Sequence, residues 1–329
     1  MFDLSFLKST AHRLLTTATE VCSRKSVSSQ QGFAAVILMA FVALVLVGAG
    51  GGGSYYYASE QKKELKSLTR KQSENFSNLE EKYKKIVDTY KQSKDDANSK
   101  KSVLGVTYEK GQVLGVEDSA SVVFSRQLLE LYRDAKANTK QIQTDNDAIK
   151  EKANNPLVKP FLGTTLPTEK TDQFVTETDA IITYLEKSTD IQIKASTVGY
   201  DLGVSLGKAI IEPTEEQIQA LEAKIKEFKE LADESREATG TGIPKGLEES
   251  QTKGNEAADK IVTEFDKIPT LLRNKDAAGL EALFRNIGLA AGVEGQKGEV
   301  ALMTFWQSNP TIRQVEELKN DWSNSSNKL

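Results

Sequence analysis

The side chains that most often perform catalysis, histidine and cysteine, each occur once in this sequence, as His12 and Cys22 near its start. A Cys–His nucleophile pair, a Ser-His-Asp triad or a typical zinc site needs such side chains in the folded body. The sequence also lacks a Gly-Lys-Ser/Thr phosphate loop and a dinucleotide-binding fingerprint. Asp and Glu are abundant, but no pair stands out for carboxylate chemistry. We therefore expect no enzymatic activity, no cofactor and no metal site.

Two further patterns have both a chemical and a structural interpretation. Asp145-Asn146-Asp147 resembles the start of a calcium loop, but the loop glycine and the terminal glutamate are missing. A solvated helix face is therefore the favoured interpretation. Trp306 and Trp322 could form the floor of a ligand pocket, but tryptophans near a C-terminus more often seal the last helices of a core.

One apolar stretch, FAAVILMAFVALVLVGAG at residues 33–50, precedes the helices that would position these side chains. It carries no charge, and the charge-free window around it extends from Ser26 to Ser59. A helix that crosses a bilayer needs about 20 apolar residues. We therefore expect a transmembrane helix at residues 33–50, with membrane lipid as a partner.

The segment before this stretch, residues 1–32, is predicted to be a cytoplasmic amphipathic tail or leader. Its apolar residues recur at spacings of three and four, and it carries a net charge of +2, whereas the rest of the chain carries −6. The body also lacks cysteine. We expect a single-pass protein of the cell membrane with a cytoplasmic N-terminus and an exported body. Cleavage after Ala49 is the alternative that would release the body.

Residues around the apolar stretch also carry a resemblance. Lys25, Gly32 and Phe33, followed by the apolar run, resemble the Gly-Phe-Ala-initiated, prepilin-like anchors of uncharacterised surface proteins from small-genome candidate-phylum bacteria. The resemblance covers the anchor only and implies a bacterial envelope location, with Gly32 as a possible cleavage site. The chain departs from major pilins at Ile37, where those proteins carry a glutamate.

Residues 51–102 are predicted to form a long membrane-proximal helix, because residues 58–98 contain neither proline nor glycine. The residues at helical spacing form a narrow stripe along this helix. Such a stripe is typical of a coiled-coil stalk that associates with a second copy or a protein partner, and equally of one arm of an intramolecular bundle. The stripe consists of Leu65, Leu68, Gln72, Phe76, Leu79, Tyr83, Ile86 and Tyr90.

The rest of the chain is predicted to be a connector, a bundle and a tail. Residues 103–116 contain Val-Leu-Gly-Val twice, which favours a connector with a possible short hairpin. Residues 117–323 carry successive helical patterns, including one at 271–287, and are expected to form a helical bundle domain. Glycines 199, 203 and 207 are expected to allow close packing of helices. Residues 324–329 are expected to be a loose tail.

The charge of the chain bears on the class of partner that it can bind. The net charge is −4, from 43 basic and 47 acidic side chains, which disfavours a nucleic-acid partner. We therefore expect an all-α protein: a single transmembrane helix, a long helix and a multi-helix bundle. Its expected role is that of a membrane-anchored envelope protein with structural or protein-interaction functions. The alternatives are a pilin-like subunit processed at Gly32 and a ligand-binding sensory bundle that needs a signalling partner.

Overall fold

The computed structural model describes the backbone of residues 29–99, 101–103, 106–109, 112–113, 120–156, 158–240, 242–289, 293 and 295–329. Side chains are described within residues 57–92 and, apart from isolated positions, within residues 122–329. His12, Cys22 and the predicted amphipathic tail lie outside the described residues. The chain divides into unit 1, residues 1–64 with 154–162, and unit 2, residues 65–153 with 163–329. Each unit is described by itself.

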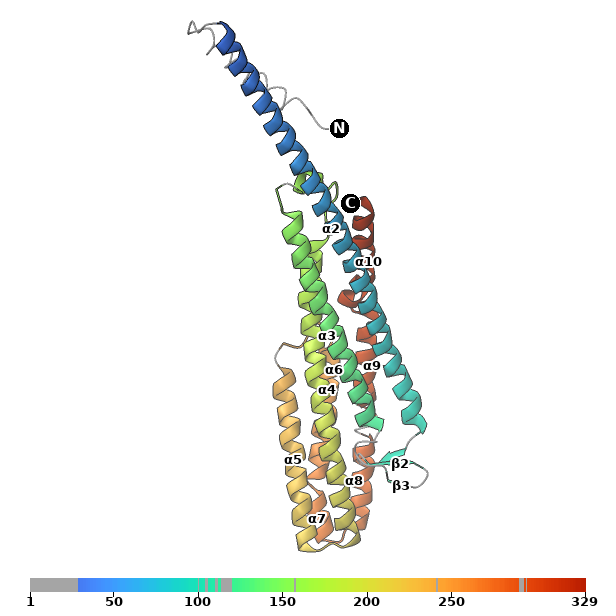
Figure 1. The fold of residues 1–329 in the computed structure, drawn as a ribbon. Coiled ribbons are helices and arrows are strands. Elements are labelled where there is room, and N and C mark those ends of the chain that lie inside the picture. The colour runs from blue at the N-terminus through green and yellow to red at the C-terminus, as the bar shows by residue number, and fades with distance from the viewer. Residues whose placement is uncertain are drawn as a thin grey trace. The chain divides into compact units, whose positions relative to one another are not determined.

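The regular structure of the described residues is helical apart from three short strands and one 3-10 helix (Figure 1). This confirms the predicted helical bundle. In chain order, the elements are α2 (Ser29–Ser99), β1 (Lys101–Val103), β2 (Val106–Glu109), β3 (Gln112–Val113), α3 (Ala120–Ala153), η2 (Lys159–Phe161), α4 (Thr168–Ile211), α5 (Glu215–Gly240), α6 (Glu248–Phe265), α7 (Ile268–Arg273), α8 (Ala277–Leu289), α9 (Gly295–Ser308) and α10 (Pro310–Lys328).

Unit 1 contains the first part of α2 and the 3-10 helix η2. The backbone N–H groups of Val158 and Lys159 both donate to the carbonyl oxygen of Asn155 at 2.9 Å, which forms the turn that leads into η2. The predicted transmembrane segment, residues 33–50, lies in the part of α2 without described side chains. Among the residues that the structure describes, no helix has the length and apolar character needed to cross a membrane.

The three strands form a small antiparallel sheet in the order β1-β2-β3. Val103 of β1 lies opposite Val106 of β2, and Tyr108 of β2 lies opposite Val113 of β3. The strands thus pair between sequence neighbours within the stretch that carries the Val-Leu-Gly-Val repeat. Such local antiparallel pairs need only short connections.

The first core of unit 2 lies where α2, α3, α4 and α10 run beside one another (Figure 1). The ring of Phe76 in α2 packs on Phe174 of α4 with centroids 5.4 Å apart. Gln72 Nε2 donates to the Ile142 carbonyl of α3 at 2.9 Å, and Ser73 Oγ donates to the Lys319 carbonyl of α10 at 3.0 Å. Seven of the eight stripe residues of α2 are buried, so the stripe is used within the chain, as in a bundle arm.

The second core of unit 2 lies around the C-terminal half of α4. Its members are apolar side chains at helical spacing. A large aliphatic or aromatic side chain that is fully buried stabilises the fold by about 1.5–3 kcal/mol. They come from α4, α5, α6, α7 and α8: Leu202, Leu206, Ala209, Ile218, Leu221, Ile225, Phe265, Ile268, Leu272, Leu283 and Ile287. Helix α4 extends without interruption from the first core to the second.

An aromatic cluster joins α2, α3 and α9. Trp306 is 4% exposed, stacks on Tyr132 with centroids 6.1 Å apart, and meets Tyr83 edge-on at 5.5 Å. The hydroxyls of Tyr90 and Tyr132 lie 2.8 Å apart. Burial raises the pKa of the Tyr83 and Tyr132 phenols above the usual value. Trp306 is therefore a core residue, as the structural interpretation of the two tryptophans predicted.

The structure divides the predicted helix at residues 271–287 into α7 and α8. Lys275 has a φ of 54°, which no helix interior adopts, and the Asp276 carboxylate accepts the N–H of Gly279 at 2.9 Å to begin α8. A Cβ at Gly279 would lie 2.7 Å from Leu271 Cδ2, so a larger residue there would displace the end of that side chain. The break was missed because the apolar positions keep their helical spacing across it.

Two other predictions are wrong. The tail at residues 324–329 is not loose, because α10 extends to Lys328 and Ser326 Oγ donates to the Lys66 carbonyl of α2 at 3.5 Å. Close packing does not explain Gly199 and Gly207 in α4, since a Cβ at either position would meet no atom within 4 Å.

Candidate functional site

The Asp145-Asn146-Asp147 motif lies in α3 and faces other helices with two of its three side chains. Asp145 is 4% exposed, and its carboxylate accepts from Lys71 Nζ at 3.0 Å, Asn75 Nδ2 at 2.7 Å and Gln141 Nε2 at 2.9 Å. These donors come from α2 and from α3 itself. The buried carboxylate therefore links α3 to α2.

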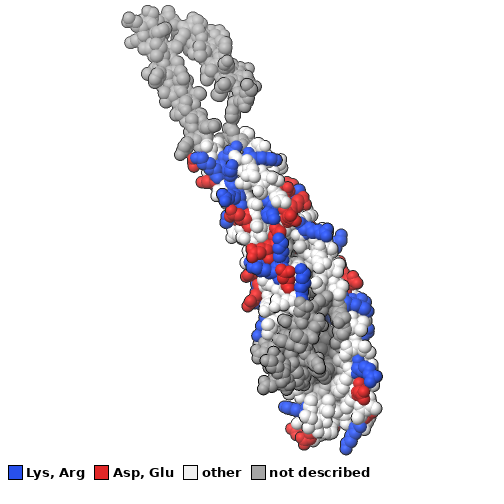
Figure 2. Space-filling model, turned by 90° about the vertical axis from the view of Figure 1, so that its right-hand side faces the viewer, with Lys and Arg blue, Asp and Glu red and all other residues white. Residues whose placement is uncertain are grey.

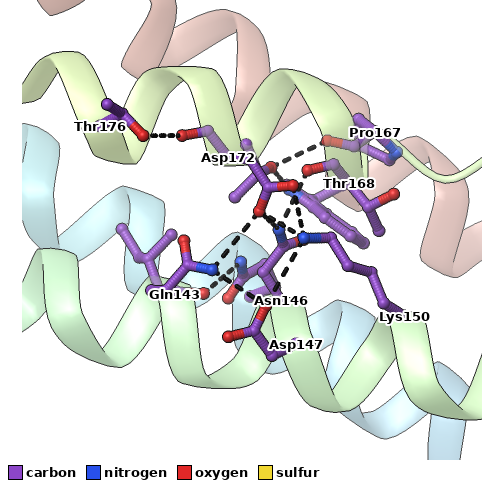
Figure 3. Close-up of polar contacts among 12 residues, drawn as sticks. Gln143, Asn146, Asp147, Lys150, Pro167, Thr168, Asp172 and Thr176 are labelled. Carbon is purple, nitrogen blue, oxygen red and sulfur yellow. Dashed lines mark hydrogen bonds and ion pairs between the residues drawn. The ribbon is translucent and has the colours of Figure 1, made fainter.

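The second motif residue, Asn146, links α3 to α4 (Figure 3). Its Nδ2 donates to Asp172 Oδ1 at 2.8 Å and to the Thr168 carbonyl at 3.0 Å. Gln143 Nε2 and Lys150 Nζ also contact the Asp172 carboxylate, so three side chains of α3 converge on one side chain of α4. Asp172 thus serves as the acceptor that fixes α3 against α4.

The prediction of a solvated helix face at this motif is wrong for Asp145 and Asn146, because both are buried. Asp147 is exposed, as predicted. The residues that the structure describes contain no group of three or more metal-ligating side chains. Asp145 and Asn146 each form hydrogen bonds with a neighbouring helix, so the motif is a structural contact.

A groove lies elsewhere in unit 2, beside α9. Its volume is about 1230 Å³, and its walls come from α4, α6, α9, α10 and the turn at residues 242–247. The face of α9 that lines it combines small, aliphatic and polar side chains at helical spacing. These are Lys297, Val300, Ala301, Thr304 and Ser308.

The end of the groove near the start of α10 is held by a set of hydrogen bonds. Asn309 caps α10, with its Oδ1 accepting from the backbone N–H of Thr311 at 2.9 Å. Its Nδ2 donates to the Lys245 carbonyl at 3.4 Å, which ties the turn to α10. Thr311 Oγ1 donates to Glu177 Oε2 of α4 at 2.7 Å. The wall at this end is therefore built from three segments that are distant in sequence.

Gly246 lets the turn approach the floor of the groove. Its φ is 95°, a left-handed conformation, and a Cβ at this position would lie 3.1 Å from Phe305 Cδ2. The backbone conformation favours glycine, since an L-residue is strained there whatever the space around it.

Replacing Gly246 with alanine is expected to lower the free energy of unfolding by about 1–3 kcal/mol, because the backbone must hold a strained conformation. Urea unfolding of the full chain in detergent micelles measures the change. Gly254→Ala in α6 is the matched control, since its Cβ meets no atom within 4 Å and alanine favours helix. Equal stability of the Gly246 variant and the native chain would contradict the assignment.

The lining of the groove suits contact with another macromolecule better than chemistry on a small molecule. Val300 is 53% exposed although it is aliphatic, and the buried side chains of Phe305 and Ile181 also line the groove. Around them stand two carboxylates, Glu177 and Glu249, and two ammonium groups, Lys245 and Lys297. Charges of both signs at an apolar surface are typical of the rim of a protein interface.

Charge on the rest of the surface is also mixed. On the face shown in Figure 2, lysines and arginines are interspersed with aspartates and glutamates among the described residues. Many form ion pairs, such as Lys319 with Glu80 at 2.6 Å between α10 and α2, and these contacts hold the pKa of Glu80 below its usual value. The described residues on that face therefore form no broad basic area.

The groove was not predicted from the sequence. Trp306 and Trp322, the two aromatic side chains that the sequence singled out, are both buried, and Phe305 lines the groove instead. The turn around Pro244 and the Asn309-Pro310 pair were visible in the sequence, but they signal only where helices end. Comparison of the chain with protein-family models, curated proteins and solved structures finds no match.

Proposed function

We propose that this protein is a membrane-anchored envelope protein whose helical body binds a protein segment in the groove beside α9. The segment at residues 33–50 serves as the anchor, the N-terminus stays in the cytoplasm and the body is exported. In this proposal the chain performs no enzymatic reaction, and its partners are membrane lipid and protein rather than nucleic acid.

The lining of the groove carries the proposal. The volume of about 1230 Å³ exceeds the roughly 300–1,000 Å³ that is typical of small-molecule pockets. One face of α9 contributes to the lining, with Lys297, Ala301, Thr304 and Ser308 spaced by four, three and four residues. A groove between helices with an apolar base and charged edges supports recognition of an amphipathic helix.

The anchor and the topology rest on the sequence. The apolar stretch at residues 33–50 carries no charge, the preceding 32 residues are net positive, and the only cysteine precedes the stretch. A single anchor followed by a helical body without catalytic motifs is suited to holding a binding surface at a membrane.

Site-specific photo-crosslinking tests the groove. A benzophenone amino acid at Thr304, an exposed groove position, is expected to yield an adduct with a protein in intact cells that express the full chain. The matched control is Val204, which is 37% exposed on α4 and does not line the groove. Adducts from both positions alike, or from neither, would contradict the proposal. An adduct with a small molecule alone would favour the sensory alternative.

A further inference from the structure

The connection between α3 and α4 lies beside the part of α2 that follows the apolar stretch (Figure 1). Residues 154–162, which include η2, belong to the same compact unit as residues 1–64. Ala58 of α2 is 5% exposed and Val158 is 1% exposed. They are the buried side chains among those that the structure describes in unit 1, so they mark the level at which η2 packs along α2.

This level is close to the surface of a bilayer that contains residues 33–50. Helix α2 continues without a break from Ser29 to Ser99, so the distance along it follows from the number of residues. Ala58 lies eight residues beyond Gly50, which is about 12 Å along the helix. The headgroup layer beside the hydrocarbon core is about 5–8 Å thick. Long side chains at the level of Ala58 therefore reach lipid phosphates.

Two lysines at this level form no ion pair with any residue that the structure describes. Lys159 of η2 is exposed and Lys62 of α2 is half-buried. Lys63, by contrast, pairs with Glu60 at 2.8 Å. The sequence around η2 adds no negative charge, since residues 152–168 contain no acidic side chain. Both ammonium groups are thus available to an anion from outside the chain.

The geometry of α2 directs Lys62 toward the apolar stretch. Side chains of an α-helix lean toward its N-terminus, which in α2 is the end that carries residues 33–50. Lys62 lies one turn after Ala58 on the same face, and Lys159 directly follows Val158. The two lysines therefore adjoin the place where η2 packs on α2.

We propose that Lys62 and Lys159 bind the phosphate groups of anionic lipids, so that η2 forms a second membrane contact beside the anchor. This inference rests on the proposed function, because residues 33–50 must span the bilayer to bring η2 to its surface. A lipid ligand is favoured over a protein, since the headgroup layer is the surface within reach of η2. The contact holds the body against the membrane in a fixed orientation.

Fluorescence quenching by lipids that carry a nitroxide on the headgroup tests this contact. The full chain with Cys22→Ser and Pro160→Cys carries a bimane label at position 160 and is reconstituted in vesicles of phosphatidylcholine and phosphatidylglycerol. The label is expected to be quenched, and less so without phosphatidylglycerol. Val204→Cys is the exposed control and should stay unquenched, because it lies 36 residues beyond Thr168, about 54 Å along α4.

A label-free measurement covers the case in which the substitution at position 160 disturbs η2. Hydrogen–deuterium exchange of residues 154–162 in the native chain is expected to slow when phosphatidylglycerol is added to the vesicles. Exchange that is the same in both lipids, together with quenching that is equal at positions 160 and 204, would overturn the inference.

Removal of the two charges tests the lysines. Lys62→Gln combined with Lys159→Gln is expected to lower the ratio of lipid-bound to free η2 by about fivefold for each lysine. The matched control replaces two other exposed lysines, Lys85 of α2 and Lys226 of α5, with glutamine and should leave the ratio unchanged. An equal effect of the two double variants would rule out the lysines as the lipid ligands.

Carbonate extraction of the same vesicles reports on the anchor separately. A chain that stays in the vesicles while position 160 is unquenched keeps the proposed anchor and overturns the contact of η2 with lipid. A chain that carbonate removes overturns the anchor, and with it the second contact.

Discussion

Replacing Trp322 with alanine is expected to lower the free energy of unfolding by about 3–5 kcal/mol. The side chain is 0% exposed and lies at the end of the first core of unit 2. Its Nε1 donates to Thr171 Oγ1 at 3.0 Å, and that hydroxyl donates in turn to the Pro167 carbonyl at 2.9 Å. Truncation removes the ring from α10 and leaves a cavity beside the first turn of α4.

Urea unfolding of the full chain in detergent micelles, followed by circular dichroism, measures this loss. Trp322→Phe separates packing from hydrogen bonding, since it keeps most of the ring volume and removes the donor. It is expected to cost about 1–2 kcal/mol. A loss below about 1 kcal/mol for the alanine variant would mean that α10 does not seal this core.

The second large effect is expected at the Asp145 carboxylate. Asn75→Leu removes the donor at 2.7 Å from a carboxylate that is 4% exposed, and Asn75 itself is 7% exposed. The carboxylate keeps its contacts with Lys71 and Gln141 but loses its closest partner from the buried side of α2. We expect a loss of about 3 kcal/mol in the free energy of unfolding, because a buried charge is left short of a hydrogen bond.

A double-mutant cycle identifies the cause. Asn75→Leu combined with Asp145→Leu replaces the polar pair with two apolar side chains, and it should be more stable than Asn75→Leu alone. The coupling free energy between the two positions is expected to be about 1–3 kcal/mol. Strictly additive losses would show that the two side chains do not stabilise the fold together.

The sequence was sufficient to predict the helices wherever one face is continuously apolar. The stripe from Leu65 to Tyr90 predicted the second part of α2. At the start of α5, Thr214 Oγ1 accepts the Gln217 N–H at 3.3 Å, a contact typical of a Thr-x-x-Gln capping box. Such patterns identify a buried face without identifying its partner. The choice between a stalk and a bundle arm therefore required the contacts of Phe76 and Gln72 with α4 and α3.

The polar contacts were not predictable for the same reason. Asp145 and Asn146 have the composition of a solvated face, and they are buried only because Asn75 and Asp172, distant in sequence, supply their partners. The groove depends in the same way on Glu177 and Thr311, which are 134 residues apart. Helix periodicity carries no information on such long-range pairs. The end of α10 was missed because Ser325 and Ser326 are polar and weak helix formers, yet both are buried.

The most direct test of the membrane-anchored, exported body is trypsin treatment of intact cells, followed by mass spectrometry of the released and membrane-retained fragments. Lys245 lies exposed in the turn between α5 and α6 and is an expected cleavage site. We expect the body to be cut while residues 1–30 survive with the membrane. A retained fragment that begins at Phe33 would instead identify the pilin-like alternative. A body that stays intact on whole cells but is cut in inside-out vesicles would contradict the proposed topology.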